Sequence, residues 1–294
     1  MSDGLKIAGW LFVPENLPPG EKAPGIVLAN GFSTIKEIYM KNFAERFAGA
    51  GFVVLAFDYR HFGESEGEPR NQLFPYDELQ DVRNAVSFLA TQPEVEPTRL
   101  GAWGVSLGGG HVMYLAAFDR RLKAVVAQVP AVNQFENFRT MMPPPAFAGL
   151  IKMLNDDRQE RFTSGEVRYL TLVAPPGQGG LMPPEAYEFY MTAQSTVAPT
   201  WRNELTIESL EKFLEYDPCG PIHMAAPTAI MMIVGNQDVI IPPALAKEAF
   251  ERAGEPKKMV LIEGRHVDMY PGYPYFEQAV TEATNWFLEH IGSN

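Results

Sequence analysis

A serine flanked by glycines is the residue best suited to act as a nucleophile. Ser106 lies in Gly104-Val-Ser-Leu-Gly108, after a β-rich apolar run and before a segment with helical character. A sharp strand-to-helix turn strains the serine backbone, requires small neighbours and exposes the hydroxyl above a sheet. The Leu107 N–H would then lie at the helix start, where it can stabilise an oxyanion. The motif predicts nucleophilic catalysis, and the alternative is a glycine-rich turn without chemistry.

A serine hydroxyl also needs a base to accept its proton and an acid to orient that base. After a serine on such a turn, the acid comes first in the chain and the histidine second, each in a loop that follows a strand. Asp238 follows the apolar run 228–234, and His266 follows the run 258–262. We therefore predict Asp238 as the acid and His266 as the general base. Other candidates match this order less well, namely His111, His223, His290, Asp217 and Asp268.

A second oxyanion donor is expected in the loop after an early strand, close to the nucleophile turn. The run 25–29 is followed by Asn30-Gly-Phe-Ser33, in which Gly31 allows a bend. The backbone N–H of Phe32 is the predicted donor, and a plain turn is the alternative.

The elements that must position these residues alternate along the chain. Strands are predicted at 6–13, 25–29, 52–57, 99–105, 124–129, 228–234 and 258–262. Helices are predicted at 36–48, 77–90, 107–117, 243–252 and 276–290. The central strands are continuously apolar, as strands buried on both faces of a parallel sheet must be. The alternation predicts βαβ units and a doubly wound, mostly parallel α/β sheet.

The alternation stops in a segment rich in proline, glycine, methionine and aromatic residues. We predict that residues 1–130 and 227–294 form the core and that residues 131–226 form a helical and loop insertion, a lid over a pocket. The alternative is an accessory subdomain that does not contact ligand. Arg158, Arg161 and Arg168 are interpreted as a solvated face rather than as an anion site. The residues predicted to line the pocket are Met141, Met142, Phe147, Tyr187, Tyr190 and Trp201.

Composition excludes several classes of protein. Lys and Arg number 24 against 36 Asp and Glu, a net charge of −12, which disfavours a nucleic-acid partner. The single cysteine, Cys219, cannot form a disulfide within the chain, and the N-terminus lacks the pattern of a leader peptide. No apolar run is long enough to span a bilayer. We expect a soluble, cytoplasmic protein without a membrane partner, and the sequence predicts no metal and no cofactor.

Several motifs together resemble those of the α/β-hydrolase superfamily, across residues 5–130 and 227–291: Ala29-Asn-Gly-Phe32 and the stretches 58–67, 104–108, 235–238 and 264–266. Within it the sequence is most similar to the dienelactone-hydrolase-like and X-Pro-peptidase-like serine hydrolases, which include relatives acting on polyketide esters. Asn30 departs from the histidine of many relatives. In relatives the stretch 58–67 is mainly structural, so Asp58 and Arg60 are interpreted as supporting residues.

The predicted function is that of a serine hydrolase that cleaves a carboxylic ester or thioester of a hydrophobic, small-molecule acyl substrate. The same three side chains would also serve an acyltransferase, a C–C bond hydrolase or a cofactor-free haloperoxidase. A ligand receptor on a hydrolase fold that has lost turnover is a further alternative. A homodimer formed through the insertion or an edge strand is compatible with the sequence.

Overall fold

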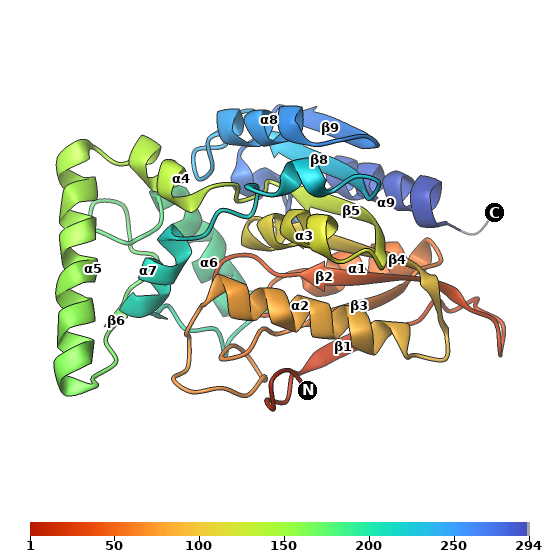
Figure 1. The fold of residues 1–294 in the computed structure, drawn as a ribbon, viewed down its shortest axis with the longest axis horizontal. Coiled ribbons are helices and arrows are strands. Elements are labelled where there is room, and N and C mark those ends of the chain that lie inside the picture. The colour runs from red at the N-terminus through yellow and green to blue at the C-terminus, as the bar shows by residue number, and fades with distance from the viewer. Residues whose placement is uncertain (293–294) are drawn as a thin grey trace.

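A mostly parallel sheet of seven strands forms the centre of the computed structural model, which describes residues 1–292 (Figure 1). In spatial order its strands are β1 (Gly9–Phe12), β3 (Val53–Phe57), β2 (Ala23–Ala29), β4 (Val95–Val105), β5 (Leu122–Gln128), β8 (Ala229–Gly235) and β9 (Lys257–Ile262). Strand β1 pairs antiparallel with β3, and the other neighbours pair in parallel. Every residue of β2, β3 and β8 is buried, because helices cover both faces. The predicted doubly wound sheet is confirmed.

Two layers of helices enclose the sheet. Helices α1 (Met40–Gly49) and α9 (Phe276–Ile291) pack on one face, where Phe43 lies 4.2 Å from Trp103 between ring centroids. Helices α2 (Pro75–Ala90), α3 (Leu107–Phe118) and α8 (Pro243–Arg252) cover the other face. Since the parallel strands run in one direction, the loops after β2, β4, β5, β8 and β9 meet at one edge. The candidate catalytic residues lie in these loops.

The chain between β5 and β8 leaves the sheet and lies beyond this same edge (Figure 1). It contains α4 (Gln134–Met141), α5 (Pro144–Ser164), β6 (Tyr169–Leu170), α6 (Pro184–Thr196), β7 (Leu205–Thr206), α7 (Ile207–Leu214) and the 3-10 turn η1 (Ile222–Met224). Helices α5 and α6 begin at prolines, which fit the first turn of a helix because they have no N–H to leave unpaired. This part of the chain is therefore more helical than its proline content indicated.

Strand β1 spans Gly9–Phe12 rather than residues 6–13, β4 begins at Val95 rather than at residue 99, and two further differences have structural reasons. Helix α1 begins at Met40 rather than at residue 36, because Tyr39 has a left-handed φ of 65° and the Lys36 N–H donates to Asp58 instead of entering a helix. The antiparallel pair β6–β7 was not predicted, since strands of two residues leave no periodic pattern.

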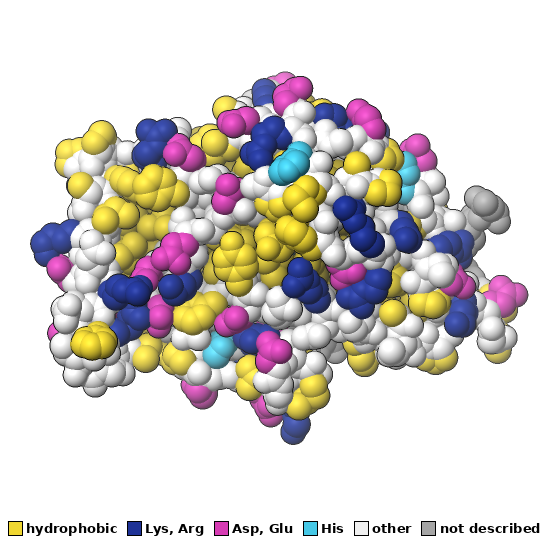
Figure 2. Space-filling view, viewed as in Figure 1, with side chains coloured by type: hydrophobic (Ala, Val, Ile, Leu, Met, Phe, Trp, Pro, Cys, Tyr) yellow, Lys and Arg dark blue, Asp and Glu magenta, His cyan; other side chains and the backbone are white. Residues whose placement is uncertain are grey.

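The visible surface mixes both signs of charge. In Figure 2 Lys, Arg, Asp and Glu side chains are interspersed, and hydrophobic side chains gather over the α4–α5 region and the middle of the molecule. None of the helices in residues 1–292 has both the length and the apolar character needed to cross a bilayer.

Candidate active site

Ser106 occupies a tight turn between β4 and α3. Its backbone has φ 56° and ψ −117°, a left-handed conformation that is strained for a residue with a side chain. A Cβ atom at Gly104 would lie 2.1 Å from the Gly108 carbonyl oxygen, and one at Gly108 would lie 2.1 Å from the Ala29 carbonyl oxygen. Both glycines are therefore required by close backbone contacts on either side of the turn, as the motif predicted.

Asp238 and His266 meet at the ends of neighbouring strands. Asp238 follows β8, and His266 begins the 3-10 turn η2 (His266–Met269) after β9. His266 Nδ1 lies 2.7 Å from Asp238 Oδ2, while Asp238 Oδ1 accepts the N–H groups of Ile240 and Ile241, each at 2.8 Å. A carboxylate on Nδ1 places the ring proton there and leaves Nε2 as the free acceptor. The imidazole is thus held in the tautomer that a general base requires.

Ser106 and His266 line the same narrow cavity, together with Phe32 and Tyr270. Within residues 1–292 no hydrogen bond joins Ser106 to His266. Catalytic hydrogen bonds are often long in a protein without substrate and tighten when substrate binds. The structure thus brings together the three side chains that the sequence singled out, with the serine–histidine contact open.

The β2–α1 loop (residues 30–39) passes directly over the serine turn. A Cβ atom at Gly31 would lie 3.6 Å from Ser106 Cβ, and the Phe32 N–H has no acceptor in the described part of the chain. Leu107 is the first residue of α3, where an N–H has no partner within the helix. Two backbone donors next to the serine are therefore available to an oxygen with developing negative charge.

Two aromatic side chains from beyond β5 hold this loop. The Tyr190 hydroxyl donates to the Phe32 carbonyl at 2.6 Å, and Trp201 Nε1 donates to the Ser33 carbonyl at 2.8 Å. The two rings are stacked, with centroids 4.9 Å apart. Burial raises the pKa of Tyr190, so its hydroxyl remains a donor. The conformation of the β2–α1 loop is thus set by residues 158 or more positions away in the sequence.

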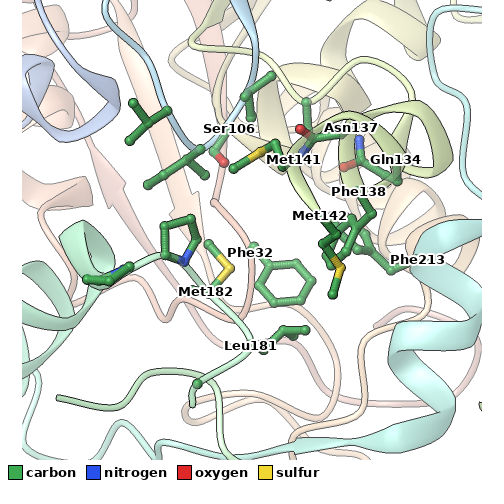
Figure 3. A pocket seen from close by; sticks show the side chains of 17 residues that line it. Phe32, Ser106, Gln134, Asn137, Phe138, Met141, Met142, Leu181, Met182 and Phe213 are labelled. Atoms are coloured by element: carbon green, nitrogen blue, oxygen red, sulfur yellow. The ribbon is translucent and has the colours of Figure 1, made fainter. Parts of the chain in front are cut away.

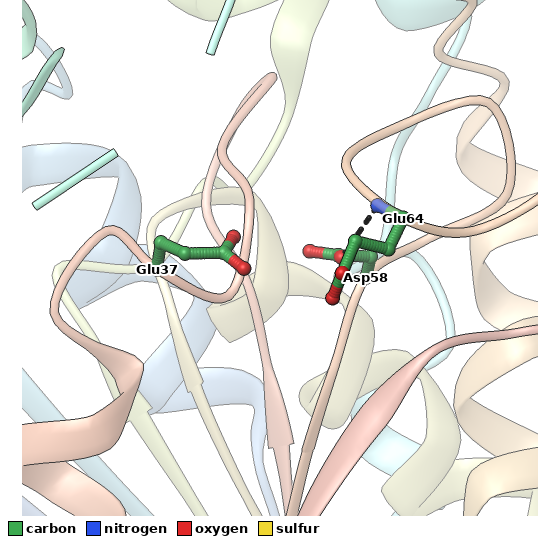
Figure 4. Close-up of side chains that lie close together, drawn as sticks. All are labelled: Glu37, Asp58 and Glu64. Carbon is green, nitrogen blue, oxygen red and sulfur yellow. Dashed lines mark hydrogen bonds between the residues drawn. The ribbon is translucent and has the colours of Figure 1, made fainter. Parts of the chain in front are cut away.

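A buried ammonium anchors the other end of the loop. Lys36 Nζ donates to Asp58, Glu37 and Glu64 at 2.8, 2.8 and 2.6 Å, and these three carboxylates converge as Figure 4 shows. Burial lowers the pKa of Lys36, but these hydrogen bonds outweigh it and leave the pKa above its usual value. The ammonium occupies the position where a metal ion would contact all three carboxylates. Its role is to attach the β2–α1 loop to the end of β3.

Arg60 also has a supporting geometry. Its guanidinium binds Asp81 with contacts of 2.8 to 3.1 Å and reaches Ser2 and Asp3. It therefore ties the N-terminus to α2, away from the serine. Asp58 and Arg60 both form buried ion pairs, which agrees with their interpretation as structural residues.

A larger cavity of about 410 Å³ opens from Ser106 toward α4 (Figure 3). Of the residues predicted to line a substrate pocket, Met141 and Met142 line this cavity, and Tyr190 lines the narrow cavity beside His266. Phe147, Tyr187 and Trp201 line neither cavity. Phe147 packs edge-on against Phe135, and Trp201 is committed to Tyr190 and the Ser33 carbonyl.

Several lining residues were missed by the sequence prediction: Gln134, Asn137, Phe138, Leu181, Met182, Phe213, Ile240 and Ile241. Those on α4 follow a helical spacing with Met141, since residues 134, 137, 138 and 141 share one face of a helix. This spacing was the signal that could have identified them. The others come from separate loops and carry no common pattern.

Four of the alternative acids and bases have partners other than Ser106. Asp268 pairs with Arg265 at 2.9 Å, and Asp217 accepts the N–H groups of Cys219 and Gly220. His111 is fully buried. The remaining partners of these groups are as follows: His111 contacts Glu78 and Tyr216, His290 packs on Trp286, and Arg158, Arg161 and Arg168 pair with Asp157, Glu208 and Glu211.

A parallel sheet with a serine on a strained strand-to-helix turn defines an α/β hydrolase, which confirms the resemblance in the motifs. The fold agrees with the crystal structure of the α/β hydrolase GrgF from Penicillium sp. sh18, with a TM-score of 0.82 and 24% identity over 99% of this chain and 96% of that one. Residues 3–268 match the family model described as X-Pro dipeptidyl-peptidase (S15 family). The chain belongs to this family.

Two curated relatives that align with most of the chain are named a thiohydrolase and a polyketide transferase. Thiohydrolase aneE from Aspergillus aculeatus is 32% identical over 297 residues, covering 98% of this chain and 91% of the relative. Polyketide transferase ATR5 from Stachybotrys chlorohalonatus is 29% identical over 279 residues, covering 92% of this chain and 89% of the relative. These likenesses support an ester or thioester hydrolase or an acyltransferase.

Proposed function

We propose that the protein is a serine hydrolase that cleaves the thioester or carboxylic ester of a hydrophobic acyl group through an acyl-enzyme. The observation that carries this proposal is the position of Ser106, which lies on a strained turn where two cavities meet. One cavity contains His266 held by Asp238, and the other has the size and apolar lining for an acyl chain.

In the proposed reaction Ser106 Oγ attacks the acyl carbonyl carbon while His266 Nε2 accepts the hydroxyl proton. Asp238 holds the imidazole and stabilises its positive charge. The N–H groups of Phe32 and Leu107 bind the oxyanion, each contributing about 3 kcal/mol to transition-state stabilisation. The tetrahedral intermediate collapses, the thiol or alcohol leaves with the proton from His266, and an ester to Ser106 remains. Water activated by His266 then releases the acid.

The lining of the large cavity favours acyl groups over peptides. Among the described residues that line it, none carries a charge. A dipeptidyl substrate would bring a free ammonium into this space and would lose its hydration without gaining a carboxylate partner, at a cost of several kcal/mol. In this proposal the protein shares its fold and its nucleophile with the peptidase family. Its large cavity, in contrast, suits an uncharged acyl chain.

The segment between β5 and β8 acts, in this proposal, as a lid that selects the acyl chain. It supplies α4 and Met182 to the large cavity and Tyr190 to the narrow one. The core supplies Ser106, Asp238 and His266. Chemistry and substrate selection would thus come from different parts of the chain.

Acyl transfer is the second candidate, and the name of the relative ATR5 favours it. It differs only in the group that attacks the acyl-enzyme, an alcohol or amine instead of water. Mass spectrometry of the products, with and without a competing alcohol, distinguishes the two reactions.

Replacement of the nucleophile tests the proposal directly. Ser106→Ala should abolish turnover of p-nitrophenyl esters and acyl thioesters and should prevent labelling by a fluorophosphonate. Ser195→Ala provides the control, because Ser195 is exposed on α6 and bonds only the Thr192 carbonyl within the described chain. Undiminished turnover by Ser106→Ala would refute the assigned nucleophile.

A further inference from the structure

Two side-chain amides on α4 line the large cavity without hydrogen-bond partners. Gln134 is 1% exposed, and neither its Oε1 nor its Nε2 has a partner within residues 1–292. Asn137 is 6% exposed, and its Oδ1 is likewise unpaired there. Figure 3 shows both side chains in the wall that also contains Ser106 and Met141.

Unpaired buried amides destabilise a folded protein, because their lost hydration is not replaced. Three neighbouring residues of the cavity wall, Phe138, Met141 and Phe213, offer no hydroxyl or carboxylate. The two amides are three residues apart and therefore lie on the same face of α4. A pair of unpaired amides on the cavity side of one helix is best explained by a ligand that completes their hydrogen bonds.

We propose that Gln134 and Asn137 form a polar subsite that binds a hydroxyl group on the acyl chain of the substrate. The unpaired atoms are one donor, Gln134 Nε2, and two acceptors, Gln134 Oε1 and Asn137 Oδ1. A hydroxyl both donates and accepts, so it can pair with a donor and an acceptor at once. A ketone only accepts and would leave both amide oxygens unpaired. The inference rests on the proposed function, because it assigns the acyl chain to the large cavity.

This subsite makes the enzyme selective in one direction. A site built to hydrogen-bond a substrate group discriminates against the analogue that lacks it, because the protein groups then stay buried and unpaired. Hydroxyacyl esters should be preferred over unsubstituted acyl esters of equal length. Gln134 and Asn137 would be specificity-determining residues that take no part in the chemical step.

The test compares octanoyl-N-acetylcysteamine with its 3-, 5- and 7-hydroxy derivatives and its 3-oxo derivative. For the wild-type protein we expect kcat/KM to be about tenfold or more higher for at least one hydroxy derivative than for the octanoyl and 3-oxo compounds. Gln134→Met and Asn137→Leu should remove this preference, so that each variant hydrolyses the hydroxy derivatives with a kcat/KM close to its own value for the octanoyl compound. Met141→Leu, a change on the same helix without hydrogen-bonding groups, should alter all rates in parallel.

A binding measurement separates this inference from the proposed function. Calorimetric binding of the same thioesters to Ser106→Ala reports hydroxyl recognition without turnover. Suppose that Ser106→Ala binds the hydroxy derivatives more tightly, but that the wild type shows no turnover or that Ser106→Ala retains the wild-type turnover. This result would retain the subsite and overturn the proposed function. Equal binding and equal turnover of hydroxy and unsubstituted compounds would overturn the subsite alone.

Thermal unfolding gives a readout independent of substrate. Gln134→Met should leave Tm unchanged or raise it, because it removes an unpaired buried amide from the free protein. A clear drop in Tm would mean that the amide serves the fold, and it would contradict the inference.

Discussion

Asp238→Asn tests how the carboxylate controls the proposed base. Asp238 Oδ1 accepts two backbone N–H groups at 2.8 Å, and Oδ2 faces His266 Nδ1 at 2.7 Å. An asparagine that keeps its oxygen on the two N–H groups must present its NH₂ group to Nδ1. In the reverse orientation the NH₂ group would face the N–H groups of Ile240 and Ile241, so that two donors would point at a third donor and remain unpaired. The imidazole should therefore take its proton on Nε2 and lose the ability to accept one from Ser106.

The expected loss is about 10⁴-fold in kcat, the size found when a triad histidine is held in the wrong tautomer. This corresponds to about 5 kcal/mol of transition-state stabilisation. The fold should survive, because the two side chains have the same shape. Steady-state hydrolysis of p-nitrophenyl butyrate and the rate of fluorophosphonate labelling measure the effect, and circular dichroism checks the fold.

Asp217→Asn is the matched control for this substitution. Asp217 Oδ1 also accepts two backbone N–H groups, those of Cys219 and Gly220, but no histidine bonds it in the described chain. Its activity should stay within a few-fold of the wild type. If Asp238→Asn also kept activity within tenfold, the tautomer argument would be refuted.

Three further predictions concern the surroundings of the site. Tyr190→Phe removes the hydroxyl that holds the β2–α1 loop, and kcat should fall about tenfold with little change in KM. Steady-state kinetics measure both constants, and a change in KM alone would contradict this prediction. Lys36→Met leaves Asp58 buried without its cation, and chemical denaturation should show that the free energy of unfolding falls by about 3–5 kcal/mol. The double variant Lys36→Met/Asp58→Asn should recover most of this stability. Burial lowers the pKa of His111 to about 3, so the unfolded chain takes up a proton that the folded chain does not. The free energy of unfolding should therefore fall with decreasing pH, by up to about 1.4 kcal/mol per pH unit. Burial raises the pKa of Glu78, so above about pH 4.5 the folded chain takes up a proton on Glu78 that the unfolded chain does not, and this opposes the effect of His111. The fall should therefore be seen below about pH 4.5. Urea titrations of His111→Gln should show a shallower slope than the wild type, and equal slopes would disprove the assignment.

The core of the fold was predictable because its signals are local. Strands β2, β3 and β8 are buried along their whole length, so each one is a continuous apolar run in the sequence. The seven predicted strands correspond to the seven strands of the sheet. The order serine, acid, histidine selected three residues that the structure places at one edge of that sheet. Strand direction explains why they lie close together, since parallel strands bring the loops that follow them to a common edge.

The cavities were not predictable in the same way. Phe147, Tyr187 and Trp201 have the composition of a pocket lining but lie outside both cavities, whereas Gln134 and Asn137 line one. Composition reports which side chains are apolar, and it does not report which face each helix turns toward Ser106. Packing between segments far apart in the chain decides that.

The sequence by itself determined the α/β alternation and the tight turn at Ser106, because periodicity and glycine sterics act over a few positions. Only the tertiary structure decided how the β2–α1 loop is held, through Tyr190 and Trp201 on one side and Lys36 on the other. It also decided that Gln134 and Asn137 line the large cavity while three of their side-chain atoms have no hydrogen-bond partner within residues 1–292. These features depend on contacts between distant segments, and such contacts exist only once the chain has packed.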